Sequence, residues 1–124
     1  MDDLVVWLRA QLDADAARAE AAPCGPWSVD VSGSIVDADG GRVIPSVGGA
    51  RDGHPVRWPE GPVVEHVVGH DPARVLREID ALRQIVDRYA WLREHGDTGG
   101  IGWVLQVLAL PYNDRPGYLD SWRP

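Results

Sequence analysis

The sequence has no lysine, no phenylalanine, one cysteine and no long hydrophobic run. The single cysteine, Cys24, cannot form a disulfide within the chain or a zinc site of several cysteines, which excludes a secreted disulfide scaffold and a zinc ribbon. No apolar run reaches the ~20 residues that a membrane-spanning helix needs. Asp2 and Asp3 stand where a signal peptide would carry basic residues. We therefore expect a cytoplasmic protein without membrane association.

Arginine alone carries the positive charge, and acidic residues outnumber it. Twelve arginines stand against nineteen aspartates and glutamates, and the formal net charge is −7. Such a surface repels the phosphates of nucleic acids and of anionic membranes, so we expect no nucleic-acid partner. Arginine in place of lysine, in a chain rich in alanine, glycine, proline and aspartate, indicates the codon bias of a GC-rich genome rather than a phosphate-binding surface.

The size and composition are those of one globular domain. The chain has 124 residues, of which 44% are hydrophobic and 25% charged. A domain of this length buries roughly two thirds of its unfolded surface, so it needs no metal or disulfide to fold. We expect residues 1–124 to form a single α+β domain. Its expected parts are an N-terminal helix, a small antiparallel β-hairpin sheet, a long central helix, a short apolar C-terminal helix and a packed aromatic tail.

The N-terminal half predicts a helix followed by short strands. Apolar residues at steps of three and four predict an amphipathic helix over residues 3–21, with Trp7 off its apolar stripe. Two prolines then end the helix. Alternation over residues 27–31 predicts a strand, and the segments 34–38 and 42–47 flank a glycine-rich turn sequence that predicts a hairpin.

Residues 48–62 are rich in glycine and proline and predict a long loop. Trp58 within it either pins the loop to the core or stacks on a ligand. Residues 62–69 fit two structures equally well, a short helix that begins at Pro62 or a strand of valines.

The central helix is the clearest pattern. Asp71 is a natural N-cap, Pro72 suits the first helical position, and the periodicity continues to about Glu94. Trp91 lies on its polar side and either packs under the C-terminal tail or marks a contact surface. The apolar stripe comprises Val75, Ile79, Leu82, Val86 and Tyr89, and the solvated face comprises Arg77, Asp80, Arg83, Gln84, Asp87 and Arg88.

The C-terminal segments are apolar and aromatic. Residues 101–110 predict a short buried helix, with an inner strand as the alternative. Residues 111–124 are too aromatic for a free end and should pack back onto the domain.

Two histidines four residues apart, His66 and His70, give the one spacing with metal-binding potential. On a helix their rings would share a face, whereas on a strand they would lie ~13 Å apart and could not hold one ion. Gly69 interrupts a helix between them, and spacing fixes no third ligand. A structural role is therefore favoured, with His70 beside the helix entry at Asp71, and we predict no cofactor.

Signatures of catalysis are lacking. No serine lies in a nucleophile-elbow sequence, no base adjoins Cys24, and the glycines follow neither the phosphate-loop nor the dinucleotide-binding pattern. We therefore expect no enzymatic activity.

Three stretches together resemble a known family. They are residues 1–13, with Trp7-Leu8-Arg9; residues 70–78, His-Asp-Pro-Ala-Arg-Val-Leu-Arg-Glu; and residues 109–124, with Leu-Pro-Tyr and a Trp-Arg-Pro ending. They resemble domain-of-unknown-function family 6221, small uncharacterised proteins of actinobacteria and their phages. The resemblance covers about half of the chain and implies no activity, because the family has none assigned.

Two hypotheses about function remain. The first is an interaction protein that binds another protein, or a second copy of itself, through the apolar stripe and the tryptophan-bearing surfaces at Trp7 and Trp91. The alternative is a small metal- or ligand-binding protein, possibly an enzyme, that uses His66, His70 and Asp71 with help from the loop. The candidate functional surface thus comprises His66, His70, Asp71, Trp7, Trp58 and Trp91.

Overall fold

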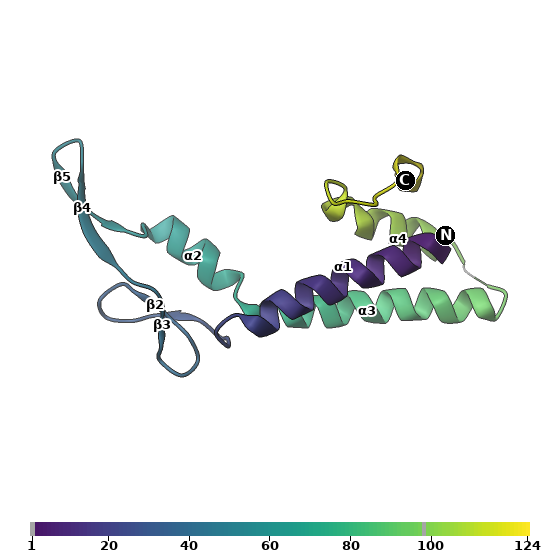
Figure 1. Cartoon of the computed structure of the whole chain (residues 1–124), viewed down its shortest axis with the longest axis horizontal. Coiled ribbons are helices and arrows are strands. Elements are labelled where there is room, and N and C mark those ends of the chain that lie inside the picture. Colours follow the sequence, from purple (N-terminus) through teal and green to yellow (C-terminus); the bar gives the residue numbers. More distant parts are fainter. Residues whose placement is uncertain (1, 98) are drawn as a thin grey trace. The chain divides into compact units, whose positions relative to one another are not determined.

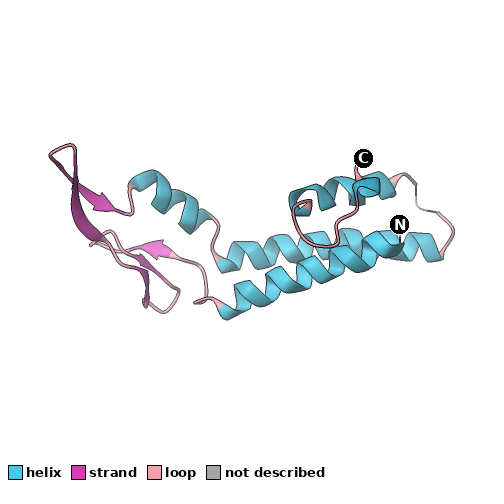
Figure 2. Cartoon of the chain, turned by 45° about the horizontal axis from the view of Figure 1, so that its top comes forward, coloured by secondary structure: helices cyan, strands magenta, loops and turns pink. Residues whose placement is uncertain are grey.

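The computed structural model describes residues 2–97 and 99–124. They form four α-helices, five strands and two 3-10 helices, an α+β fold (Figure 1). Two compact units divide the chain: unit 1 comprises residues up to Ala17 together with Glu78–Pro124, and unit 2 comprises Arg18–Arg77. Every strand belongs to unit 2, as Figure 2 shows. The elements are α1 (Asp2–Ala21), β1 (Ser28–Val29), β2 (Ile35–Val36), β3 (Arg42–Ile44), β4 (Val47–Arg51), β5 (His54–Trp58), α2 (Gly61–Gly69), α3 (Pro72–Glu94), α4 (Ile101–Ala109), η1 (Leu110–Tyr112) and η2 (Asp120–Trp122).

In unit 1, α1 and α3 run antiparallel. Three ion pairs show this direction, because residues later in α1 pair with residues earlier in α3. They are Asp2 with Arg93 at 2.7 Å, Arg9 with Asp87 at 3.0 Å and Asp13 with Arg83 at 2.7 Å. All three are exposed, so each contributes little stability and serves mainly to set the register. The core between the helices comprises Leu4, Val5, Leu8, Leu12, Ala16, Ile79, Val86 and Tyr89.

The C-terminal part of unit 1 confirms the predicted short helix and packed tail. Leu105 and Ala109 of α4 are fully buried. The tail then returns to the beginning of α1 (Figures 1 and 2), where Trp122 is 6% exposed. Arg115 ties the tail to α1 through an ion pair with Asp15 at 2.9 Å, and its guanidinium lies 4.6 Å from the Tyr112 ring centroid.

Unit 2 contains the predicted hairpin, β2–β3, to which β1 adds a third antiparallel strand. Asp37 organises the β2–β3 turn, since one of its carboxylate oxygens accepts the N–H groups of Asp39 and Gly41. Ile35 and Ser34 are buried, and the Ser34 hydroxyl accepts the Ser46 N–H at 2.9 Å.

The structure corrects the prediction of a loop over residues 48–62. β4 and β5 form a regular antiparallel hairpin there, and α2 begins at Gly61. Asp52 and Gly53, with φ of 52° and 77°, form a two-residue turn that suits the twist of a hairpin. Glycine and proline in the strands concealed the pattern, because neither supplies the β-branched side chains by which strands are recognised. The following segment, left open between helix and strand, is helix α2.

The long central helix begins as predicted. Asp71 caps it, since one carboxylate oxygen accepts the Arg74 N–H at 2.9 Å. The other oxygen accepts the Trp27 N–H at 2.8 Å, which attaches the segment before β1 to the start of α3.

Candidate functional site

The N-terminal half of α1 carries a second apolar face besides the one that enters the core. Asp3, Val6, Trp7 and Ala10 are spaced by three and four residues and share this face. The tail packs alongside it and contributes Leu119 and Trp122. Together they line a shallow groove of about 580 Å³, bordered by Asp2, within unit 1; we call this the α1–tail groove.

Aromatic packing holds the groove in shape. The Trp7 indole donates to the Pro116 carbonyl at 3.1 Å. Its ring lies 5.4 Å from that of Trp122 and 5.7 Å from that of Tyr118, in tilted and edge-on arrangements that aromatic pairs favour. Tyr118 and Trp122 also meet edge to face at 5.7 Å. Trp7 and Trp122 thus line the groove, and the Tyr118 ring packs against both of them.

The backbone of Gly117 in the tail lies close to the Trp7 indole. Gly117 has φ of 86°, and a Cβ atom built there would lie 2.8 Å from the Trp7 indole nitrogen. Only glycine fits this position without displacing the indole. The Tyr118 hydroxyl is buried and, among the described residues, has no hydrogen-bond partner.

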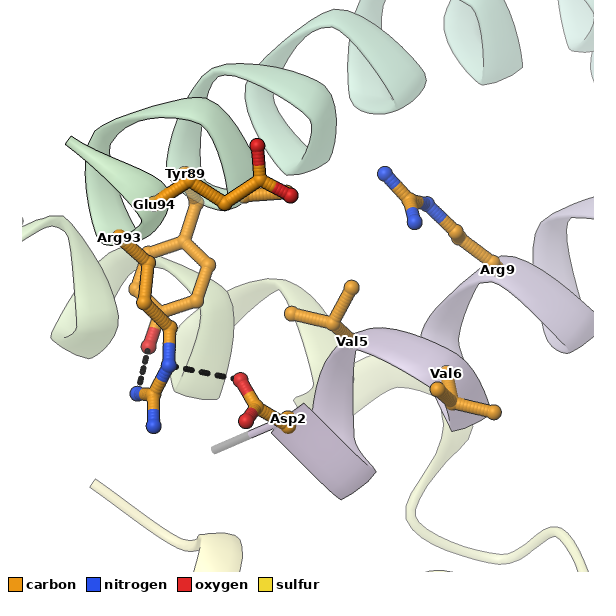
Figure 3. A pocket seen from close by; sticks show the side chains of 8 residues that line it. Asp2, Val5, Val6, Arg9, Tyr89, Arg93 and Glu94 are labelled. Carbon is orange, nitrogen blue, oxygen red and sulfur yellow. Dashed lines mark hydrogen bonds and ion pairs between the residues drawn. The ribbon is translucent and has the colours of Figure 1, made fainter.

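The floor and rim of the groove differ in polarity. Val6 is 69% exposed and Leu119 is 45% exposed, which makes an apolar patch open to solvent. Asp2 and Asp3 add carboxylates at one edge. The Asp2 carboxylate pairs with Arg93, which also donates to the Tyr89 hydroxyl at 3.2 Å, and these side chains line a second, more polar pocket that shares Val6 with the groove (Figure 3). The groove can therefore take apolar side chains from a ligand.

The structure brings His66 of α2 together with His70, the residue that follows α2, but adds no carboxylate of the described residues to complete a metal site. Their rings stack with centroids 4.3 Å apart, and His70 Nδ1 lies 2.7 Å from the His66 carbonyl oxygen. Asp71, the expected third member, uses both carboxylate oxygens on the backbone N–H groups of Arg74 and Trp27. Within residues 2–97 and 99–124, no cluster of three potential metal ligands occurs.

The capping bonds also determine the charge state of Asp71. Burial by itself would raise the pKa of this carboxyl. The N–H groups of Arg74 and Trp27 and the nearby charge of Arg77 outweigh burial and leave the pKa below its usual range. Asp71 is thus a structural carboxylate.

Cys24 is an exposed free thiol, and its surroundings do not activate it. The hydrogen bond to the Asp39 carboxylate, at 3.5 Å, and the charge of that carboxylate raise the pKa of the Cys24 thiol. A nucleophilic cysteine requires the opposite shift.

The three tryptophans named from the sequence have different settings. Trp7 is half-buried and forms a wall of the groove. Trp58 is 53% exposed on β5, opposite Val47 of β4. Trp91 is 46% exposed, stacks on His95 at 3.9 Å and lies under the guanidinium of Arg88 at 4.7 Å.

Sequence reasoning missed three exposed or lining residues. Val6 and Leu119 form the open part of the groove, and Trp103 is 61% exposed on α4. The spacing of Val6, Trp7 and Ala10 on one face of α1 was the available signal. Leu119 gave none, because its place depends on the return of the tail.

Comparisons with known proteins place the chain in one family. A model described as a family of unknown function (DUF6221) matches residues 1–124, which extends the three stretches of resemblance to the whole chain. No curated protein and no solved structure matches. In the described part of the chain, no helix combines the length and apolar character needed to cross a membrane.

Proposed function

We propose that this chain, which belongs to the family of unknown function DUF6221, is a non-catalytic protein-interaction module. Its binding surface is the α1–tail groove, and its ligand is an apolar side chain or a short apolar segment of another protein. The observation that carries the proposal is the solvent exposure of Val6 and Leu119 beside the fixed rings of Trp7 and Trp122.

Rigid aromatic side chains with an exposed apolar neighbour are features of interaction surfaces. Tryptophan is enriched among residues that dominate binding energy, and a wall that is already ordered loses little entropy when a partner docks. A single exposed valine would mean nothing, but here Val6 lies in a concave surface with Leu119 and Trp122.

The chemistry of the remaining polar groups supports a binding role over a catalytic one. The Cys24 thiol has a raised pKa, and Asp71 is committed to backbone N–H groups. His66 and His70 alone remain for the metal-binding alternative, as two rings stacked on each other rather than directed at a common point. The free thiol also supports action in a reducing compartment such as the cytoplasm.

Val6→Asp tests the proposal. The substitution places a charge in the groove, and Val6 is exposed, so the core of α1 stays intact. We expect a partner captured from the host lysate by the wild-type chain, then purified, to bind the variant at least tenfold more weakly by calorimetry, because burying an unpaired carboxylate is unfavourable.

The matched control is Val31→Asp, since Val31 is a fully exposed valine in unit 2, outside the groove. It adds the same charge and should leave affinity unchanged. Equal affinity of both variants and the wild type would refute the groove as the binding surface.

A further inference from the structure

The β4–β5 hairpin presents a strand edge that no described segment of its own chain pairs. Among the described residues, β4 is hydrogen-bonded to β5 alone, and the two strands form a sheet separate from β1–β2–β3. Every residue of the hairpin strands is exposed except the half-buried Val56. A two-stranded ribbon with so little packing gains stability when another strand is added.

The register tells which backbone groups point outward. Arg51 and His54 face each other across the two-residue turn. In such a hairpin the pair beside the turn exchanges both backbone hydrogen bonds, and the next pair exchanges none. Gly48 and Ala50 belong to the pairs without such bonds, so their N–H and C=O groups point away from β5.

The two edges of the hairpin are not equivalent. On β5 the outward position Pro55 has no N–H, and proline is a common means of blocking an edge. On β4 positions 48–50 are glycine, glycine and alanine, and a Cβ atom added at Gly48 or Gly49 would have no atom within 4 Å. The edge of β4 is therefore open to a third strand, and that of β5 is not.

The hairpin region differs in charge from the rest of the chain. Residues 47–58 hold two arginines and one acidic residue, whereas the remaining residues hold ten arginines and eighteen acidic residues. Arg57 donates to the Ser46 hydroxyl at 3.2 Å, so its guanidinium extends to the β4 side of the sheet. Arg51 pairs with Glu60 yet keeps 65% of its side chain exposed.

We propose that the outer edge of β4 binds an extended acidic segment of a partner protein, which adds a third strand to the hairpin. Gly48 and Ala50 supply the main-chain hydrogen bonds. Arg57, on the face of Gly48, and Arg51, on the opposite face, can each receive a carboxylate of the added strand. Two copies joined edge to edge would bring together two hairpins that each carry more basic than acidic residues, which charge repulsion disfavours. This surface is independent of the α1–tail groove.

Backbone amide spectra of the ¹⁵N-labelled chain test the proposal. The probe is a pool of peptides Glu-X-Glu-X-Glu with X as valine, isoleucine or threonine, compared with the same pool carrying lysine in place of glutamate. We expect the glutamate pool at millimolar concentration to shift the Gly48 and Ala50 amides and to slow their hydrogen exchange. The lysine pool should leave them unchanged.

Two variants separate the two parts of the site. Ala50→Pro removes an outward donor without removing a β4–β5 bond and should abolish the response, while amides outside the hairpin stay in place. Arg57→Gln should weaken binding about two- to fivefold, the size expected for one exposed charge pair. Arg123→Gln is the control, because it changes the net charge equally at an exposed site in unit 1.

Four outcomes would overturn the proposal. They are no shift with any peptide, equal shifts with the lysine pool, shifts confined to the α1–tail groove, and concentration-dependent shifts of Gly48 and Ala50 without peptide, which would indicate pairing between copies. A mixed-sequence oligodeoxynucleotide that shifts these amides more strongly than the glutamate pool would assign the edge to nucleic acid instead.

Discussion

At the scale of single residues, the Tyr118 hydroxyl in the tail of unit 1 is expected to lower the stability of the fold. The Tyr118 ring contacts Trp7 and Trp122, but its hydroxyl is buried without a described partner. Tyr89 is the opposite case, since it is 2% exposed and its hydroxyl accepts a hydrogen bond from Arg93. The same chemical group is thus unfavourable at one position and favourable at the other.

Tyr118→Phe should raise the free energy of unfolding by about 1 kcal/mol, because it removes a buried hydroxyl that lost its water on folding. Tyr89→Phe should lower it by about 1 kcal/mol, because it removes a satisfied one. Urea denaturation followed by circular dichroism measures both. A loss of stability in Tyr118→Phe would mean that its hydroxyl is satisfied after all.

Gly117→Ala should destabilise the chain for two reasons, the positive φ and the close approach to Trp7. Gly40→Ala is the matched control, because Gly40 has φ of 82° and open space around it. We expect Gly40→Ala to lower the free energy of unfolding by about 1 kcal/mol and Gly117→Ala by clearly more. Equal effects would show that the indole gives way freely.

At the scale of elements, prediction from the sequence succeeded where the pattern is local. The helices α1 and α3 follow from steps of three and four, and Asp71-Pro72 marked the start of α3 correctly. The prediction of a loop over residues 48–62 was wrong, because Gly48, Gly49 and Pro55 interrupt the side-chain pattern by which strands are recognised. Arg83 and Asp87, predicted for a solvated face, remain accessible but pair across to α1.

The capping of α3 predicts a pH dependence. The folded pKa of Asp71 is lowered, so its stabilising effect is fully present above the usual carboxyl value of about 3.9 and is lost as the pH falls through the folded pKa. Asp71→Ala should therefore lower the free energy of unfolding by about 1–2 kcal/mol at neutral pH. As the pH falls below the usual carboxyl value and through the folded pKa of Asp71, this difference should shrink.

Urea denaturation at a series of pH values measures this effect. Asp71→Asn serves as the control, since an asparagine side chain keeps a capping oxygen but no titratable group. At neutral pH its free energy of unfolding should lie between those of the wild type and Asp71→Ala. As the pH falls, its free energy of unfolding should change less than that of the wild type. A constant difference between wild type and Asp71→Ala down to pH 2 would contradict the lowered pKa.

At the scale of the whole molecule, the sequence predicts a single domain, and this stays a prediction. The boundary between the units falls inside α1, after Ala17, and inside α3, after Arg77. Each of these helices is therefore continuous from one unit to the other. Sequence analysis did not predict the groove, because the groove joins Trp7 to residues more than a hundred positions away.

We expect one cooperative unfolding transition, because separating the units would require α1 and α3 to break in their interiors. Far-ultraviolet circular dichroism reports all helices, and tryptophan fluorescence of Trp27→Phe reports mainly the four tryptophans of unit 1. The midpoints in urea should coincide. Midpoints that differ by more than the error would mean that the units fold separately.

The hydrogen bond between Trp7 and Pro116 spans 109 positions of the chain. Contacts of such separation close a very large loop, and the entropy lost on closing it must be offset by the other contacts of unit 1. The groove is consequently absent from any intermediate that contains α1 alone, however helical. A partner that binds the groove would then recognise only chains in which unit 1 has finished folding. A ligand of the groove would stabilise the native state relative to every partly folded state.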